Sequence, residues 1–301
     1  MNFADRLTAA IEEKGTPSLV GIDPRYEMLP AALKRGENPS RADAAAAIEE
    51  FSLRLVDVVA PLVPAVKPNI AFFEQFGWEG YRAYMNVVAR AREKGLLVIA
   101  DAKRGDIGST AEAYAVSLFD EMDVDAVTLS PWLGEDSLKP FFARFERGKG
   151  CFLLVKTSNP SSADIQDREQ DGGTVFTTVA GLVKKWGDEF IGERGLSSVG
   201  AVVGATWPEQ AADLRERMPT TPFLLPGYGA QGGKADSLRN AFGPGGTGAI
   251  VNSSRGIIFA FGKEPYAAEF GEERWEEAVH AATLAMRADL AGAVPDANWA
   301  G

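Results

Sequence analysis

An aspartate, a lysine and a second aspartate lie close together in the segment 101–106, directly after an apolar run at 96–100. Side chains alternate along a strand, so we expect Asp101 and Lys103 to point to the same side. Asp106 follows a glycine, where the chain can turn. Burying an unpaired charge costs free energy, so charged residues at the end of a buried strand indicate either a structural ion pair or a functional site. If only Asp101 and Lys103 are considered, the structural ion pair is the favoured interpretation.

Lys67 changes this balance because it ends the neighbouring apolar run. At the same level on the adjacent strand, it would complete an alternating series of charges, Lys67–Asp101–Lys103–Asp106. In a pocket with little water, such a series can hold a protonated lysine beside a reacting carbon and press a carboxylate against an anionic substrate group. No motif in the sequence indicates pyridoxal phosphate, thiamine diphosphate or a metal. We therefore expect no cofactor.

Glycines and an arginine in the last third of the chain predict an anion site. The segment 227–233 is rich in glycine, and Arg255 follows an apolar run at 249–251. Glycine lets backbone N–H groups approach an anion, and the planar fork of arginine suits phosphate. The glycines alone are equally expected in tight turns. The interpretation therefore depends on Arg255 and on where both segments lie in the fold.

Short apolar runs alternate with longer amphipathic stretches, for example 79–93, 109–121 and 208–217, and these elements must position the polar residues. Apolar strands that are each followed by a helix predict a parallel sheet covered by helices. We predict a single-domain (β/α)8 barrel over residues 1–290, with 291–301 as a flexible C-terminal tail; an open doubly wound sheet is the alternative. The predicted strands are 19–22, 65–67, 96–100, 126–129, 152–155, 199–203, 222–225 and 249–251. In such a barrel the carboxyl ends of the strands carry the site, and the last two loops usually hold phosphate.

The composition excludes several classes of protein. Of the 301 residues, 46% are hydrophobic and 24% are charged, which is typical of a soluble globular domain. The single histidine, His280, excludes metal sites that need several histidines, and the single cysteine, Cys151, excludes an internal disulfide and predicts a cytoplasmic protein. The net charge of −11 argues against a chain-wide nucleic-acid surface. No run is long enough to span a membrane, and we expect no membrane partner.

The segment D-A-K-R-G-D-I-G-S-T at 101–110 resembles the D-x-K-x-x-D signature of the orotidine 5′-phosphate decarboxylase family. The amino-acid sequence of this segment is similar to that of the longer bacterial subfamily, often called type 2. Weaker motifs follow the family's order along the chain: L-V-G-I-D-P ending at Pro24, V-K-P-N at 66–69, K-T-S-N-P at 156–160, P-G-Y-G-A-Q-G-G at 226–233 and S-S-R-G at 253–256.

This resemblance implies a cofactor-free decarboxylase that converts orotidine 5′-phosphate to UMP and CO2, the last step of pyrimidine synthesis. By motif match, Lys103 would protonate C6 of the pyrimidine. Asp101 would hold Lys103 and crowd the departing carboxylate. Lys67 would bond Asp101 and the ribose hydroxyls, Asp23 would bond a ribose hydroxyl, and Ser158 would bond the pyrimidine.

The remaining implied residues bind phosphate or serve a second subunit. Gln231 and Arg255 would bind the phosphate, and Ser254 is a further expected substrate-binding residue. In the family, the second aspartate of the signature and the threonine four residues later reach the active site of the other subunit. That maps onto Asp106 and Thr110, with Ile107 between them as a further substrate-binding residue. The resemblance therefore implies an obligate homodimer with two shared sites.

Two alternatives share the barrel. Sugar-phosphate relatives, such as 3-keto-gulonate-6-phosphate decarboxylase and hexulose-phosphate synthase, use magnesium held partly by a glutamate on the second strand. Here that position is Lys67, whose charge would repel magnesium. A non-catalytic nucleotide-binding protein would keep Gln231 and Arg255 but would not need Lys103 between two aspartates. The segments 158–173 and 227–234 are candidate lids over the site.

Overall fold

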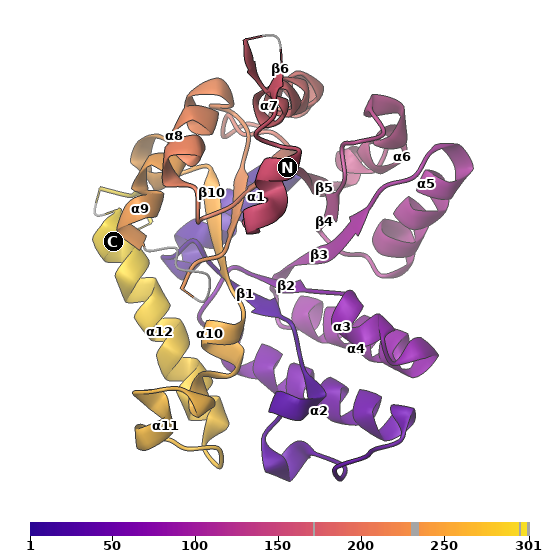
Figure 1. Ribbon diagram of the computed structural model, residues 1–301, viewed down its shortest axis with the longest axis vertical. Helices are drawn as coiled ribbons and strands as arrows, with labels where there is room; N and C mark the ends of the chain where they lie inside the picture. Colours follow the sequence, from indigo (N-terminus) through magenta and orange to yellow (C-terminus); the bar gives the residue numbers. More distant parts are fainter. Residues whose placement is uncertain (171, 230–234, 295, 300–301) are drawn as a thin grey trace.

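The computed structural model describes residues 1–301 except 171, 230–234, 295 and 300–301. Its eight barrel strands are β1 (Ser18–Ile22), β2 (Ala65–Pro68), β3 (Leu97–Arg104), β4 (Ala126–Leu129), β5 (Gly150–Lys156), β8 (Val199–Val203), β9 (Phe223–Pro226) and β10 (Ala249–Ser253). They pair in parallel in chain order, and β10 pairs back to β1. Figure 1 shows the helices around this closed sheet. The predicted (β/α)8 barrel is confirmed, and each predicted apolar run forms one of its strands.

The barrel strands are buried on both faces. Every residue of β1, β2, β4, β8 and β10 is buried. One face packs into the barrel interior and the other packs under helices, which is why these strands read as continuous apolar runs. Burial falls off at the carboxyl ends of β3 and β9, at Lys103, Arg104 and Pro226. The strands therefore open toward solvent at the end where polar residues follow them.

Helices follow the strands along the chain. They are α2 (Arg41–Val59), α3 (Ala71–Glu74), α4 (Gly77–Glu93), α5 (Gly108–Ala115), α6 (Lys139–Phe142), α7 (Val175–Gly187), α8 (Pro208–Arg217), α9 (Ala235–Leu238), α10 (Arg255–Ile258), α11 (Tyr266–Glu269) and α12 (Trp275–Ala293). The helix predicted over 109–121 begins as α5 and continues as a π-helical segment, Val116–Glu121. No helix in the described part of the chain is long and apolar enough to cross a membrane.

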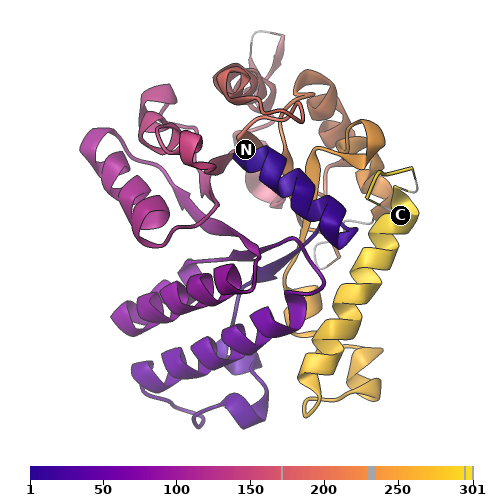
Figure 2. The same cartoon turned by 180° about the vertical axis from the view of Figure 1, so that it is seen from behind.

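The first helix, α1 (Phe3–Lys14), lies across the amino-terminal end of the barrel, as Figure 2 shows. Asn2 caps this helix by accepting a hydrogen bond from the backbone N–H of Asp5 at 2.8 Å. The ring of Phe3 packs edge-on against Phe152 of β5, with 5.9 Å between centroids. A Cβ at Gly150 would lie 2.3 Å from that ring, so glycine permits the close approach. The amino-terminal end of the barrel is thus covered by apolar packing.

The chain end packs more closely than its composition indicates. Helix α12 continues to Ala293, three residues into the segment expected to be a tail. Beyond it, Trp299 is only 3% exposed and donates its indole N–H to the carbonyl of Gly246 at 2.7 Å. Trp299 also packs against Phe242, with 6.4 Å between ring centroids. The described residues of 291–299 therefore correct the expectation of a loose tail, because a tryptophan buries enough apolar surface to hold a short segment in place.

Candidate active site

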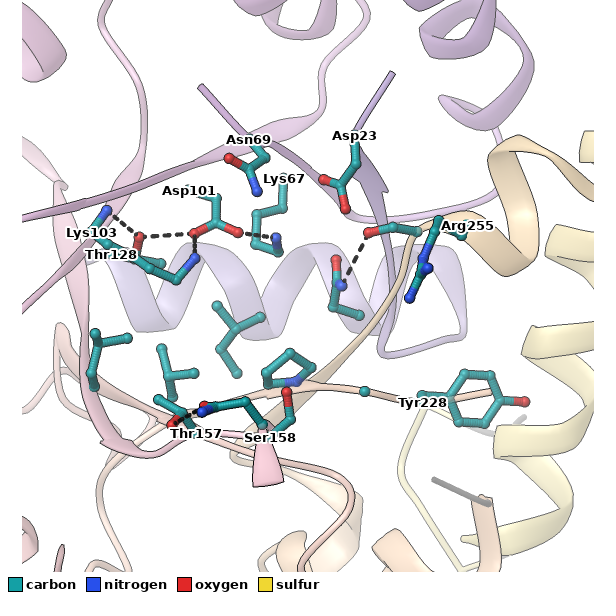
Figure 3. A pocket seen from close by; sticks show the side chains of 18 of the residues that line it. Asp23, Lys67, Asn69, Asp101, Lys103, Thr128, Thr157, Ser158, Tyr228 and Arg255 are labelled. Atoms are coloured by element: carbon teal, nitrogen blue, oxygen red, sulfur yellow. Dashed lines mark hydrogen bonds and ion pairs between the residues drawn. The ribbon is translucent and has the colours of Figure 1, made fainter. Parts of the chain in front are cut away.

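A pocket of about 520 Å³ opens where the carboxyl ends of the strands meet (Figure 3). Its walls come from residues in or after β1, β2, β3, β4, β5, β8, β9 and β10. The residues expected from the sequence that line it are Asp23, Lys67, Asp101, Lys103, Ser158, Ser254 and Arg255. The tertiary structure thus brings together side chains spread over more than two hundred positions of the chain.

Lys67 and Lys103 both donate to the carboxylate of Asp101, as the dashed lines in Figure 3 show. Nζ of Lys67 lies 2.5 Å from Oδ2, and Nζ of Lys103 bonds to Oδ1. Lys67 is 4% exposed and Asp101 is 7% exposed, whereas half of the Lys103 side chain is open to the pocket. The buried pair therefore holds the accessible ammonium of Lys103 at a defined place.

These charges shift one another's pKa values. Burial by itself would raise the pKa of Asp101, but the positive charges of Lys67 and Lys103 outweigh it and hold that pKa far below its usual value. Burial by itself would lower the pKa of Lys67, but attraction to Asp101 and Asp23 outweighs it and raises that pKa. At neutral pH, Asp101 is therefore a carboxylate and Lys67 an ammonium. The pocket thus has fixed charges of both signs at one end.

Strand β3 leaves regular geometry at this point. Ala100 lies opposite Val127 and Arg104 lies opposite Leu129, so four steps along β3 match only two along β4. Lys103 sits in this bulge with φ of 44°, a left-handed conformation that is uncommon outside glycine. Asp101 and Lys103 both line the pocket, as expected. The expected cause, a regular alternation of side chains along the strand, is wrong because the bulge interrupts that alternation.

Strands β1 and β10 form another wall of the pocket by approaching closely. A Cβ at Gly21 would lie 1.9 Å from Oγ of Ser254 and 2.9 Å from Oδ1 of Asn252, so only glycine fits there. Within the described residues, Oδ1 of Asp23 and Oδ1 of Asn252 are buried and have no hydrogen-bond partner. Both residues line the pocket. Two buried acceptors that lack donors are suited to the hydroxyl groups of a ligand.

Two arginines line the pocket, and one of them, Arg255, lies at the same end as this wall. Arg255 begins α10, and Figure 3 places it with Asp23 and Tyr228 away from Lys103. Arg25 stacks its guanidinium over the ring of Phe72 at 5.2 Å, and its buried Nε has no partner among the described residues. An arginine offers several N–H donors in a planar fork, which suits phosphate. This end of the pocket is therefore suited to an anion.

The loop after β5 forms the wall that carries Ser158. It contains a 3-10 turn, Pro160–Asp164, and the hairpin β6 (Glu169–Gln170) and β7 (Gly173–Thr174). At its base the fully buried Lys156 donates to Asp167 at 2.6 Å. This candidate lid is therefore anchored by a buried cation. Residues 230–234 of the other candidate lid lie outside the described residues.

Three expected site residues are not among the described residues that line this pocket. Asp106, Ile107 and Thr110 follow the end of β3, where Ile107 is 57% exposed and Thr110 lines a separate hollow. Oδ1 of Asp106 accepts from the backbone N–H of Ile107 at 2.8 Å. Gln231 lies outside the described residues. The first three thus lie on the surface of their own barrel, where a second subunit could reach them.

Several pocket residues were missed by the sequence analysis. They are Arg25, Asn69, Thr128 and Asn252. Asn69 ends the quoted V-K-P-N motif and Asn252 directly precedes S-S-R-G, so position within a motif was an available signal for both. Thr128 stands between apolar residues inside a predicted strand, and nothing in its neighbourhood marks it.

Comparison with known proteins assigns the chain to a family. A family profile described as "Orotidine 5'-phosphate decarboxylase / HUMPS family" matches residues 20–270. The chain belongs to this family. Orotidine 5'-phosphate decarboxylase of Rhodopirellula baltica is 46% identical over 301 residues, which covers 97% of this chain and 100% of that protein. The protein of the same name from Caldicellulosiruptor bescii is 41% identical over 276 residues, covering 87% of this chain and 90% of its own.

Solved structures of the decarboxylase family agree in fold. The structure of Leishmania donovani OMP decarboxylase is 35% identical with a TM-score of 0.71, and the match covers 94% of this chain and 99% of that one. An orotidine 5'-monophosphate decarboxylase from Methanocaldococcus jannaschii is 19% identical with a TM-score of 0.59, covering 87% and 97% of the two chains. The similarity to the Methanocaldococcus jannaschii structure supports only the barrel fold. The family expected from the D-x-K-x-x-D signature is therefore confirmed.

Proposed function

We propose that this chain decarboxylates orotidine 5′-phosphate to UMP and CO2 without a cofactor. The observation that carries the proposal is the carboxylate of Asp101, held between Lys67 and Lys103 at one end of a pocket whose other end presents Arg255. A decarboxylation without an electron sink needs fixed charges around the carbon that becomes negative. The relatives that are 46% and 41% identical are named orotidine 5'-phosphate decarboxylase, which supports the same activity.

The reaction breaks the bond between C6 of the pyrimidine and its carboxylate, and CO2 leaves while the electron pair stays on C6. Lys103 would stabilise this developing charge with its ammonium and then transfer a proton to C6. Asp101, charged and buried, would lie against the substrate carboxylate and favour its departure. Lys67 would keep Asp101 ionised. The half-exposed side chain of Lys103 can then regain a proton from solvent.

The rest of the pocket would bind and orient the nucleotide. Asp23, with a buried oxygen that lacks a donor, would bond a ribose hydroxyl, and Ser158 would bond the pyrimidine. Arg255 would bind the phosphate together with Gln231, and Ser254 lines the same end of the pocket. Phosphate binding at a distance from C6 can supply free energy that orders the reacting end. The substrate would therefore span the pocket from Arg255 to Lys103.

We also propose a homodimer with shared sites. The support for this proposal is that Asp106, Ile107 and Thr110 follow β3 outside the pocket of their own barrel, on its surface. In such a dimer each copy would complete the site of the other. The single, fully buried Cys151 supports our further proposal that the enzyme works in the reducing cytoplasm.

The test is the loss of orotidine 5′-phosphate absorbance with purified protein in excess EDTA. We expect full activity, because Lys67 occupies the second-strand position where sugar-phosphate relatives would need a carboxylate for magnesium. Activity that EDTA abolishes and magnesium restores would indicate the sugar-phosphate branch instead. Binding of UMP without any turnover of orotidine 5′-phosphate would indicate a nucleotide-binding protein.

A further inference from the structure

At the bulge in β3, two successive backbone N–H groups donate to a side chain. Both are bonded by one side chain of the neighbouring strand. Oγ1 of Thr128 accepts from the N–H of Ala102 and from the N–H of Lys103, each at 3.0 Å. Thr128 is 1% exposed, so solvent cannot take over this task. Buried N–H groups are costly to leave unpaired, and this hydroxyl satisfies both.

The hydrogen of the same hydroxyl faces the catalytic carboxylate. Oγ1 of Thr128 lies 3.2 Å from Oδ1 of Asp101, the oxygen that also accepts from Nζ of Lys103. The carbonyl of Ala100 is a second, more distant acceptor at 3.5 Å. Figure 3 shows the resulting chain of contacts from the Lys103 backbone through Thr128 to Asp101. One oxygen atom therefore links the backbone of the lysine to the group that holds its ammonium.

This link acts on a backbone conformation that does not persist by itself. Lys103 has φ of 44°, and the left-handed region is unfavourable for residues with a Cβ. Such conformations persist where surrounding contacts hold them, and they are frequent at functional sites. Oγ1 of Thr128 accepts the hydrogen bond from the N–H of Lys103, so removing the hydroxyl removes a restraint on this backbone. The backbone of Lys103 would then no longer be held by this hydrogen bond, and the position of the Lys103 ammonium would be less well defined.

We propose that Thr128 is the positioning residue for Lys103 in the reaction proposed above: it holds the bulged backbone so that the ammonium meets both Asp101 and C6. This inference rests on the proposed function for its kinetic part. Thr128 acts through Lys103, so its effect falls on the chemical step rather than on binding of the phosphate. Misplacing a reacting group by about 1 Å can cost on the order of 100-fold in rate.

The test compares Thr128→Val, which keeps the shape and removes the hydroxyl, with Thr128→Ser, which keeps the hydroxyl. We expect kcat to fall roughly 10- to 100-fold in Thr128→Val and to stay within about threefold of wild type in Thr128→Ser. The Kd for UMP should change little in either. Thr283→Val is the matched control, because Thr283 is fully buried in α12 and donates to the carbonyl of Val279 at 2.8 Å. It should leave kcat unchanged.

Wild-type kcat in Thr128→Val would overturn the inference, and so would a loss of UMP affinity that matches the loss of kcat. If Thr128→Val does not fold, Thr128→Ala removes the same oxygen and leaves room for relaxation. A second measurement needs neither turnover nor a variant: the amide hydrogens of Ala102 and Lys103 in the wild-type protein should exchange slowly. Rapid exchange at both would refute the bond to Thr128. A wild-type protein that lacks decarboxylase activity but protects both amides would refute only the proposed function.

Discussion

Lys67 and Asp101 form a buried ion pair across neighbouring strands, with 2.5 Å between Nζ and Oδ2. The pKa of Asp101 is lowered, so its contribution to stability is present above its unfolded pKa, near 4, and is lost as pH falls toward the folded value. The pKa of Lys67 is raised, so its contribution is present below about 10.4 and is lost as pH rises through the folded value. The pair therefore stabilises the fold by a constant amount across the neutral range.

Asp101→Asn should destabilise the fold by about 3 kcal/mol at neutral pH, because it removes the carboxylate that pairs with the buried ammonium of Lys67 and leaves only the attraction of Asp23. The measurement is urea unfolding of wild type and variant at several pH values. The difference in free energy of unfolding should be flat between about pH 5 and 9 and should narrow as pH falls below about 4. Equal stability at pH 7 would show that desolvation cancels the attraction within the pair.

Lys103→Ala and Arg255→Ala should separate chemistry from binding, since the two side chains lie at opposite ends of the pocket. Lys103→Ala should lower kcat by at least about 100-fold and leave UMP binding nearly intact. Arg255→Ala should weaken UMP binding by roughly 10- to 100-fold, the value of a lost charged hydrogen bond. Turnover above about a tenth of wild type in Lys103→Ala would assign proton transfer to another group.

Mixing Asp106→Ala with Lys103→Ala tests the shared site. Each homodimer should be nearly inactive. After subunit exchange, half of the dimers are hetero, and in each of these one site carries both changes while the other carries neither. Recovered activity should therefore approach about a quarter of wild type, as expected for a two-fold symmetric dimer. If mass spectrometry shows exchange but activity does not return, Asp106 acts in its own barrel.

Lys156→Met should loosen the loop that carries Ser158. The variant removes the buried bond to Asp167, whose side chain is 35% exposed and can be solvated. We expect faster proteolysis between 157 and 174 and a higher KM, with a Tm close to wild type. Lys184→Met is the matched control, because Lys184 forms an exposed pair with Asp188 at 3.0 Å, and such pairs contribute little. Equal proteolysis of the two variants would show that Lys156 does not anchor the loop.

The barrel, and the Lys67 and Asp101 part of the charge network, could be predicted from local sequence. The run at 126–129, for example, is apolar because both faces of β4 are covered, and the structure has a strand over the same residues. Lys67 and Asp101 could be placed together because the carboxyl ends of barrel strands carry the polar groups. The sequence had led us to expect the two residues at the same level, which is wrong, because Asp101 lies opposite Asn69, two residues beyond Lys67. These inferences need only burial and periodicity, which are properties of short segments.

Other features depend on contacts between segments that are far apart in the chain. In the sequence Thr128 is an ordinary strand residue. Its hydroxyl accepts from the N–H of Lys103 only because of the bulge in β3. Trp299 follows a segment without a pattern, and it is buried against Phe242 with its indole N–H bonded to the carbonyl of Gly246. The sequence by itself therefore determined the strands, the signature and the family. Only the tertiary structure decided how each side chain is held, because hydrogen-bond geometry arises from packing and not from residue type.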